Sequence, residues 1–199
     1  MELRGGVVRR TGAPVSYRPP FIDPAATTVD PPHPATIDVE TLLKQCDLQL
    51  GRRRGPGGQH RAAVASGVHL MHLPTGLEAQ ATERRSPAVN RSRAIRRLRL
   101  RLAVKVRTIP PRRGFEPSEL WRHRRQGTRI AVNPEHADYP ALLAEALDLV
   151  VVRRWDVAGA AGLLGVTMSQ LSRLIRQHPP AFAMVNDGRA SVGLARLRS

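Results

Sequence analysis

The chain has 199 residues, enough for one full domain or two small ones, and its 32 basic and 16 acidic side chains give a net charge of +16. Only Lys44 and Lys105 are lysines, so the other 30 basic residues are arginine. This charge disfavours a membrane protein and an ordinary small-molecule enzyme, and it makes a polyanion the first partner to consider. The single Cys46 has no partner for an internal disulfide, which fits a reducing, cytoplasmic compartment, and no Cys/His cluster has zinc spacing.

Residues 1–35 are expected to form a disordered arm. The first 34 residues hold 7 of the 17 prolines and show no apolar periodicity. The first 20 contain four arginines and one acid, a composition also found in mitochondrial transit peptides. Gly5, Gly6, Gly12 and Pro14 disfavour the amphipathic helix that such a peptide needs.

Residues 36–107 are expected to form the first compact domain, which begins with a short helix over Val39–Gln45 that Asp38 can cap. Val68, Leu70 and His72 alternate with other residues and are expected to share one face of a strand. The strands predicted from such patterns are Cys46–Leu50, Gly67–Leu73 and Leu77–Thr82, with a turn at Pro74–Gly76.

A long arginine-rich helix is expected to follow the strands. Ser86 is a suitable N-cap, Pro87 suits the first helical position, and the helix is predicted to run to about Val106. Ile95, Leu98, Leu102 and Val106 then fall on one face. Residues 98–102 alternate Leu-Arg-Leu-Arg-Leu, which is the strand period, but the length and the cap favour a helix.

Positive charge is concentrated in residues 84–129, which hold 16 basic and only 2 acidic side chains. This stretch is either a solvated arginine-rich surface or a nucleic-acid-binding stripe. Only Phe115 and Trp121 are aromatic within it, so the pattern favours contact with phosphates over stacking on bases. Residues 108–134 are interrupted by prolines and glycines and are predicted to be a basic linker, with a short helix over Glu119–Gln126 behind a Ser118 cap.

Residues 135–199 are expected to form a small all-α module with helices at about 138–153, 156–164 and 168–177 and another beginning near Pro180. Trp155–Arg176 fits a helix-turn-helix, with Gly165 in the turn. Its core residues would be Ala161, Leu171 and Leu174, and its outward residues Ser169, Gln170, Arg173 and Arg176. The pattern fits a DNA-binding unit or a small helical bundle, and residues 134–199 carry a net charge of only +1.

A glycine-rich segment, Gly55-Pro56-Gly57-Gly58-Gln59-His60, lies between the first two predicted strands. It lacks the Lys-Ser/Thr of a P-loop and the glycine spacing of a dinucleotide-binding loop. Gly-Gly-Gln is followed by a strand, a Pro-Thr-Gly turn, another strand and an arginine-rich helix. This order over Ile37–Arg107 resembles the catalytic domain of class I peptide chain release factors, and the chain is similar to short ribosome-rescue peptidyl-tRNA hydrolases and bacterial release-factor-like proteins.

The resemblance implies an α+β fold, with a small catalytic domain in which an arginine-rich helix packs on a short mixed or antiparallel sheet. It implies hydrolysis of the peptidyl-tRNA ester in the peptidyl-transferase centre of the large ribosomal subunit, without a cofactor or metal. Gly57, Gly58 and Gln59 would be the catalytic residues, and a glutamine methyltransferase is a possible partner acting on Gln59. The residues expected to contact ribosomal RNA are Arg52, Arg53, Arg54, His60, Arg61, Arg84, Arg85, Arg91, Arg93, Arg96 and Arg97.

Two features depart from the family and leave alternatives open. The family usually continues Gly-Gly-Gln-(His/Asn)-Val-Asn-Lys, whereas this chain has Ala62 and Ala63 in place of the Asn and Lys, which fits a non-catalytic RNA-binding paralogue. No stop-codon-reading domain and no convincing tripeptide anticodon loop such as Pro-x-Thr is recognised, which indicates codon-independent ribosome rescue. A third hypothesis is a DNA-binding regulator that acts through the helix-turn-helix.

Overall fold

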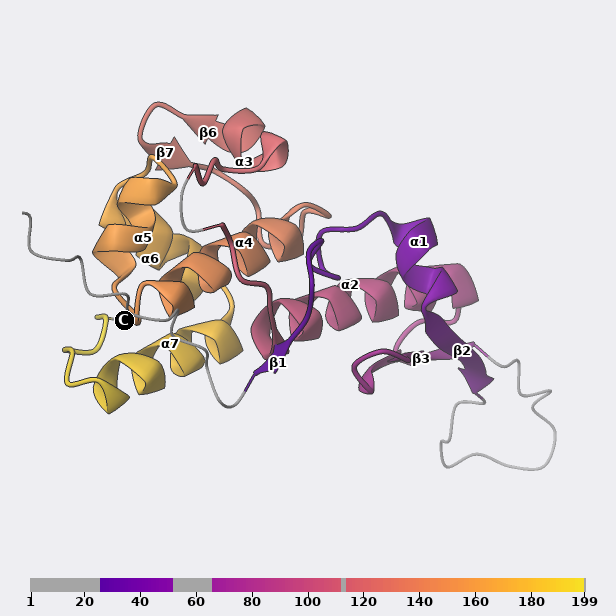
Figure 1. Ribbon diagram of the computed structural model, residues 1–199. Coiled ribbons are helices and arrows are strands. Elements are labelled where there is room, and N and C mark those ends of the chain that lie inside the picture. The colour runs from indigo at the N-terminus through magenta and orange to yellow at the C-terminus, as the bar shows by residue number, and fades with distance from the viewer. Residues whose placement is uncertain (1–25, 52–65, 112–113, 199) are drawn as a thin grey trace, which may run out of the picture.

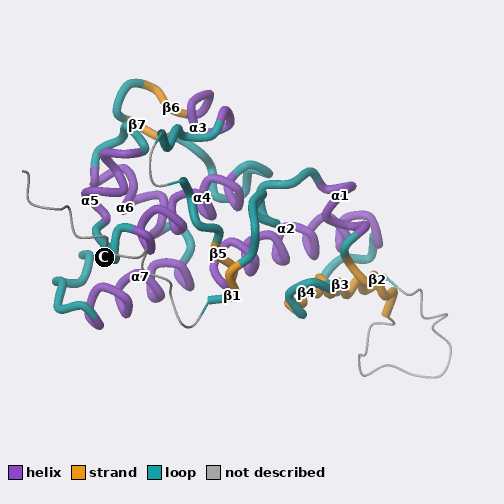
Figure 2. The backbone as a smooth tube through the Cα atoms, in the orientation of Figure 1, coloured by secondary structure: helices purple, strands orange, loops and turns teal. Residues whose placement is uncertain are grey.

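The computed structural model describes residues 26–51, 66–111 and 114–198, and shows a small antiparallel sheet at one end and helices at the other (Figures 1 and 2). The fold is α+β, as the sequence predicted. The helices are α1 (Val39–Lys44), α2 (Pro87–Lys105), α3 (Glu119–Arg124), α4 (Tyr139–Val152), α5 (Val157–Leu163), α6 (Met168–Arg176) and α7 (Pro179–Ser191). The strands are β1 (Thr27–Thr28), β2 (Cys46–Gly51), β3 (Gly67–His72), β4 (Leu77–Ala81), β5 (Val106–Arg107), β6 (Arg125–Gln126) and β7 (Arg129–Ile130).

The main sheet has the order β2-β3-β4, and both pairs are antiparallel. Val68, Leu70 and His72 are buried on one face of β3, so the predicted alternation is confirmed. Leu48 and Leu50 of β2 are exposed, at 37% and 62% of their surface. The inner strand therefore supplies most of this sheet's contribution to the core, and β2 is an edge strand of the described sheet.

Helix α2 connects the sheet to the helices. The Ser86 hydroxyl accepts a hydrogen bond from the Val89 amide and Pro87 lies in the first turn, as predicted. Leu98 and Leu100 are two residues apart, which places them on nearly opposite sides of a helix, and both are buried. This two-sided burial follows from packing against both the β3–β4 sheet and α4, and it explains the strand-like alternation in this part of the sequence.

Part of the expected disordered arm is folded. Strand β1 pairs in parallel with β5, with Thr27 opposite Val106, and Ala35 is completely buried. His33 is buried, its Nε2 lies 3.1 Å from the Val106 carbonyl, and its Nδ1 accepts a hydrogen bond from the Ala35 amide. Burial lowers the pKa of His33 to about 4, so the neutral ring makes both bonds near neutral pH. Residues 26–35 are thus fixed by long-range contacts that their composition does not indicate.

The segment expected to be a basic linker also carries structure. The Ser118 hydroxyl caps α3 as predicted, but the helix ends at Arg124, and Arg125–Gln126 pairs with Arg129–Ile130 as a hairpin. Trp121 is completely buried, and its indole N–H donates to the Leu164 carbonyl at 2.9 Å. This single aromatic side chain therefore ties residues 118–130 to the C-terminal helices.

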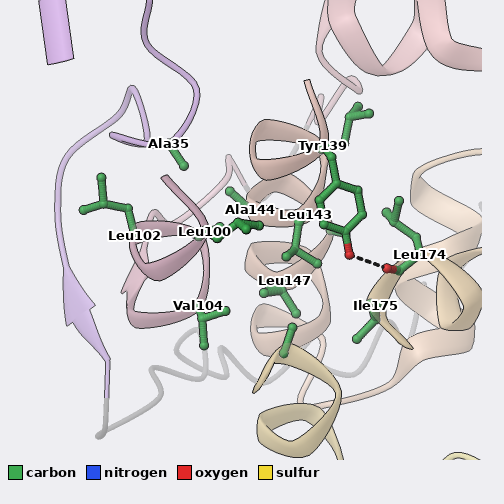
Figure 3. Close-up of a cluster of buried hydrophobic side chains, with 14 of the residues drawn as sticks. Ala35, Leu100, Leu102, Val104, Tyr139, Leu143, Ala144, Leu147, Leu174 and Ile175 are labelled. Carbon is green, nitrogen blue, oxygen red and sulfur yellow. Dashed lines mark hydrogen bonds between the residues drawn. The ribbon is translucent and has the colours of Figure 1, made fainter. Parts of the chain in front are cut away.

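Helix α4 is the centre of the helical part, and twelve of its fourteen residues are buried. Figure 3 shows Leu143, Ala144 and Leu147 of this helix among side chains from α2 and α6. The Tyr139 hydroxyl donates to the Leu174 carbonyl of α6 at 2.9 Å, and burial raises the pKa of Tyr139. The core of the protein thus continues from α2 through α4 into α6.

A buried ion pair joins the end of α2 to α4. The Arg107 guanidinium lies 3.2 Å from the Asp148 carboxylate, and both side chains are about 95% buried. The same carboxylate accepts hydrogen bonds from the amide and the hydroxyl of Thr108. Burial raises the pKa of Asp148, and the contacts with Arg107 and Thr108 oppose that shift.

Helices α5 and α6 form the predicted helix-turn-helix. Gly165 has a φ of +66°, a backbone conformation that strains any side chain, and a Cβ at this position would also displace the guanidinium group of Arg125, 2.7 Å away, so the turn favours glycine. Leu171 and Leu174 are buried, as expected for the core between the helices. The residues of α6 predicted to face outward are exposed or half-buried, and they are Ser169, Gln170, Arg173 and Arg176.

Candidate functional site

The predicted catalytic segment lies between β2 and β3. Gly57, Gly58 and Gln59 fall in residues 52–65, outside the residues that the structure describes, and so do the predicted RNA contacts Arg52, Arg53, Arg54, His60 and Arg61. The structure does describe both ends of this segment. The described part of the candidate site therefore comprises the hairpin that holds those ends and the surface beside it.

The two ends of the segment are held together by the sheet. Gly51 and Gly67 are direct partners in the β2–β3 register, which runs to Cys46 opposite His72. A Cβ on Gly67 would lie 3.0 Å from the Gly51 carbonyl oxygen and 3.1 Å from Cγ2 of Thr82. These contacts are tighter than an ordinary van der Waals contact, so glycine allows the strands to approach closely at the point where the segment begins and ends.

Asn90 fixes the beginning of β3 to helix α2. Its side-chain N–H2 donates to the carbonyls of Ser66, at 2.5 Å, and Arg84, at 2.8 Å, while its oxygen accepts from the Arg84 amide at 3.0 Å. Asn90 is completely buried and Ser66 is 5% exposed. One amide side chain therefore joins the end of the predicted catalytic segment, the turn before α2 and the helix itself.

Asn90 was not among the residues predicted from the sequence. The available signal was its position four residues before Ala94 and eight before Leu98, on what proves to be a buried side of α2. A polar residue in an apolar helical series is expected to have buried partners, because an unpaired buried amide is costly. Its partners are backbone groups, which the sequence does not reveal.

The far end of the β3–β4 hairpin has a second polar anchor. His72 is buried, its Nδ1 lies 2.7 Å from the Thr75 hydroxyl, and its Nε2 lies 3.1 Å from the side-chain oxygen of Gln45. Burial lowers the pKa of His72, which favours the neutral ring. These contacts hold the turn after β3 against the end of α1, so both ends of β3 are fixed by side chains.

The arginines near the start of α2 differ from those further along it. Arg84, Arg85 and Arg91 are exposed and Arg93 is half-buried, and their side chains have no hydrogen bond or ion pair with any described residue. Arg96 donates to the Pro134 carbonyl and to Glu135, and Arg97 donates to the Gln80 carbonyl and pairs with Glu83. The predicted RNA contacts thus comprise two groups. Arg84, Arg85, Arg91 and Arg93, here called the free arginines, have no side-chain partner among the described residues, whereas Arg96 and Arg97 are engaged within the protein.

The free arginines lie beside the anchored end of the predicted catalytic segment. Arg84 provides two of the backbone groups that bind Asn90, and Arg85 is its neighbour. Such a surface attracts phosphates without reading a base sequence. It offers no metal site, because no three His, Cys, Asp or Glu side chains gather anywhere among the described residues.

A separate hollow of about 670 Å³ lies between β4, α2 and the start of α7. His69 and Glu78 face each other across β3 and β4 at 3.2 Å on one side of it, and His178 lies on the other. Arg101, which also lines it, donates to the Glu78 carbonyl at 2.5 Å. Among the described residues of the predicted site, only Arg97 lines this hollow, and its guanidinium group is engaged with Gln80 and Glu83. Within the same described ranges, no helix is long and apolar enough to cross a membrane.

Residues 35–126 match the RF-1 domain family. Peptide chain release factor 1 of Symbiobacterium thermophilum is 34% identical over 104 residues, which are 52% of this chain and 29% of that protein. The mitochondrial peptide chain release factor 1 of Bos taurus is 41% identical over 75 residues, 38% of this chain and 17% of that one. The mitochondrial peptide chain release factor 1-like protein of Rattus norvegicus is 35% identical over 103 residues, 51% and 28% of the two chains.

Residues 35–126 thus carry an RF-1 domain, which supports the predicted resemblance to the class I peptide chain release factor superfamily. The matched region spans less than a third of each of these relatives. It includes the sheet, α2 and α3, and it ends within the β6–β7 hairpin.

Proposed function

We propose that this protein hydrolyses the ester bond of peptidyl-tRNA on the ribosome, in the manner of a release factor, without needing a stop codon. Support comes from the RF-1 domain match and from Gly57, Gly58 and Gln59 within the matched region. Codon independence is the expectation from the sequence, in which no convincing tripeptide anticodon loop such as Pro-x-Thr is recognised. The cytoplasm is the proposed location, and ribosome rescue is the proposed role.

The observation that carries the proposal is the anchored hairpin. The register of β2 and β3 brings Gly51 and Gly67 together at the ends of the Gly-Gly-Gln segment, and Asn90 fixes the end beside Ser66. A loop that must enter a catalytic centre elsewhere needs a rigid base, because small errors in position reduce the rate strongly. The free arginines next to this base would bind ribosomal RNA and orient it.

The chemistry follows from the resemblance to the release factors. Water attacks the ester carbonyl carbon, the bond to the tRNA 3′-oxygen breaks, and the proton passes to that oxygen. The backbone N–H of Gln59 would stabilise the developing negative charge, and its side chain would help position the water. Gly57 and Gly58 would let the backbone approach RNA closely. The ribosome and tRNA would supply the rest of the site, and a glutamine methyltransferase could modify Gln59.

The first test is release of labelled peptide from ribosomes that carry peptidyl-tRNA and an empty A site. The Gln59→Ala variant is expected to bind ribosomes with unchanged affinity and to release peptide at least about 100-fold more slowly, because one oriented donor or water-positioning group contributes about 10²- to 10³-fold. Ser92→Ala, on the exposed side of α2, is the control and should behave as the unmodified protein. Equal release by Gln59→Ala and the unmodified protein would overturn the proposed function.

A non-catalytic RNA-binding paralogue is the second candidate, and Ala62 and Ala63 favour it because the family has Asn and Lys at these positions. If loss of this pair removed activity, the double substitution Ala62→Asn/Ala63→Lys should restore peptide release to a protein that binds ribosomes but releases nothing. Measurable release by the unmodified protein, dependent on Gln59, would exclude this candidate.

A further inference from the structure

A basic groove lies at the C-terminal boundary of the RF-1 match, between the β6–β7 hairpin and helix α6. It has a volume of about 820 Å³. Arg124, Gln126 and Arg129 line it from the hairpin side, and Gln170, Arg173 and Gln177 line it from α6 and its end. None of the described residues that line the groove is Asp or Glu. The walls thus combine guanidinium and amide groups, which are the side chains that bind phosphates and nucleotides.

Two of the three arginines that line the groove have no side-chain partner among the described residues. Arg124 is engaged, because it donates to the Asp138 carboxylate at 2.9 and 2.5 Å. Arg129 and Arg173 are exposed, and their side chains make no hydrogen bond or ion pair within the described part of the chain. They face the groove from opposite walls, so an anionic strand between them could contact both guanidinium groups.

The two walls are fixed to each other. The Thr167 amide, at the start of α6, donates to the Thr128 carbonyl of the hairpin at 3.1 Å. Nη1 of Arg125 donates to the carbonyls of Gly127 and Gly165, both at 3.2 Å. The hairpin turn and the turn of the helix-turn-helix are therefore joined by hydrogen bonds, and the groove does not need to be assembled when a ligand binds.

We propose that this groove is a second nucleic-acid-binding site, which binds the phosphate backbone of folded RNA through Arg129 and Arg173. The choice of RNA rests on the proposed function, in which the ribosome is the partner. The groove is joined to the arginine-bearing helix α2, because α2 packs on α4, α4 packs on α6, and Arg96 of α2 donates to the Pro134 carbonyl. Both surfaces would thus be presented to one RNA particle in a fixed arrangement.

The surroundings of α6 favour backbone contact over base reading in DNA. On its other side, Met168, Ser169 and Ser172 line a hollow of about 520 Å³ whose opposite wall is formed by residues 195–198. A helix that reads DNA bases must enter the major groove. Helix α6 instead has a wall on each side, and its free arginines are suited to a strand that passes beside it.

The test measures binding of the full chain to a short RNA duplex and to the DNA duplex of the same sequence, by fluorescence anisotropy over a range of salt concentrations. The double variant Arg129→Ala/Arg173→Ala is expected to bind the RNA about tenfold or more weakly, and its slope of log affinity against log salt should be lower by about 2. Because both side chains are exposed, thermal unfolding should be unchanged, which checks that the variant folds.

A matched control removes the same charge elsewhere. Arg122→Ala/Arg196→Ala deletes two exposed arginines that pair with Glu116 and Asp187 outside the groove, and it should leave the RNA affinity within about twofold. An equal loss in the control and the groove variant would show an effect of net charge alone and overturn the proposal. Tighter binding of the DNA duplex than of the RNA duplex, or an unchanged salt slope in the groove variant, would also overturn it.

These results are separable from the proposed function. The duplex assay involves no peptide release, so loss of RNA binding in the groove variant supports the site even if Gln59→Ala leaves release intact. Conversely, Gln59-dependent release together with unchanged duplex binding in the groove variant would retain the proposed function and reject the groove.

Discussion

The two halves of helix α2, with the turn before it, use the same residue type in different ways. Near the start of the helix, four arginines have guanidinium groups without a partner among the described residues: Arg84, Arg85, Arg91 and Arg93. In the second half of the helix, four arginines donate to carbonyl or carboxylate oxygens of the protein itself: Arg96, Arg97, Arg99 and Arg101. Net charge therefore overstates the surface that is available to a polyanion, and the free arginines mark where that surface lies.

The largest expected effect comes from removing the free arginines. If each contacts one phosphate, each contributes about 0.7 log units of affinity near 0.15 M salt, so the quadruple variant Arg84→Ala/Arg85→Ala/Arg91→Ala/Arg93→Ala should bind ribosomes up to about 1,000-fold more weakly. Ribosome binding by co-sedimentation over a salt series measures this. Thermal stability should be unchanged.

Arg97, in the second half of α2, provides the control. Arg97→Ala removes an arginine that Glu83 already neutralises at 2.6 Å, so ribosome affinity should fall by less than about threefold. If this variant weakened binding as much as the average member of the quadruple set, the distinction between free and engaged arginines would be wrong.

The next largest effect concerns His33, which binds the carbonyl of Val106 at the end of α2. Its pKa is lowered by burial and by the nearby charge of Arg107 to about 4, against 6.5 in an unfolded chain. Between these values the unfolded state binds more protons, so the free energy of unfolding should fall by up to about 3 kcal/mol as the pH drops from 7 to 4.

Denaturant unfolding of the unmodified protein and of His33→Gln, at pH 7 and pH 4, isolates this contribution. The variant should lose less stability on acidification, because glutamine does not titrate. Asp148, whose pKa burial raises, acts in the opposite direction in both proteins, so it cancels in the difference. Parallel pH profiles for the two proteins would contradict the assignment to His33.

Asn90, near the start of α2, provides a test of how the end of the Gly-Gly-Gln segment is held. Asn90→Ala leaves the Ser66 carbonyl and both Arg84 backbone groups without their side-chain partner, so the free energy of unfolding should fall by about 2 kcal/mol. Peptide release at saturating protein should also slow, since the base of the catalytic segment is no longer fixed.

Ser92→Ala is the matched control on the same helix. Its exposed hydroxyl bonds only to the Ala88 carbonyl, so stability should change by less than about 0.5 kcal/mol. A stable Asn90→Ala protein with full release would show that this amide does not position the segment.

The smallest expected effect tests whether an arginine in the second half of α2 acts through its hydrogen bonds or through its charge. Arg99 donates to the Ala35 carbonyl at 2.8 and 3.1 Å and to the Ala137 carbonyl at 3.0 Å. Arg99→Lys keeps the charge and loses the forked geometry, so stability should fall by about 1 kcal/mol while ribosome affinity stays unchanged. Loss of affinity without loss of stability would place Arg99 among the free arginines instead.

Local signals predicted much of the fold. The caps at Asp38, Ser86 and Ser118 lie where the sequence placed them, and the predicted strands and C-terminal helices agree with the structure to within a few residues. Caps, turns and apolar periods are properties of neighbouring residues, which is why sequence reasoning recovered them.

Long-range contacts account for what the sequence did not predict. Thr27 pairs with Val106, His33 binds the Val106 carbonyl, and Trp121 binds the Leu164 carbonyl. Each of these links joins residues far apart in the chain, and most involve backbone groups that carry no sequence signal. The role of Asn90 could not be predicted because its partners are also backbone groups. The Gly-Gly-Gln motif could be recognised because its chemistry depends on the residue types themselves.

Codon-independent hydrolysis of peptidyl-tRNA is best tested by the rate of peptide release at saturating protein. The rate is measured on ribosomes with an empty A site and on ribosomes with a stop codon in that site. The unmodified protein is expected to release peptide from the empty-site complex at least as fast as from the stop-codon complex, and Gln59→Ala is expected to be slow on both. Release confined to the stop-codon complex, or release that does not depend on Gln59, would contradict it.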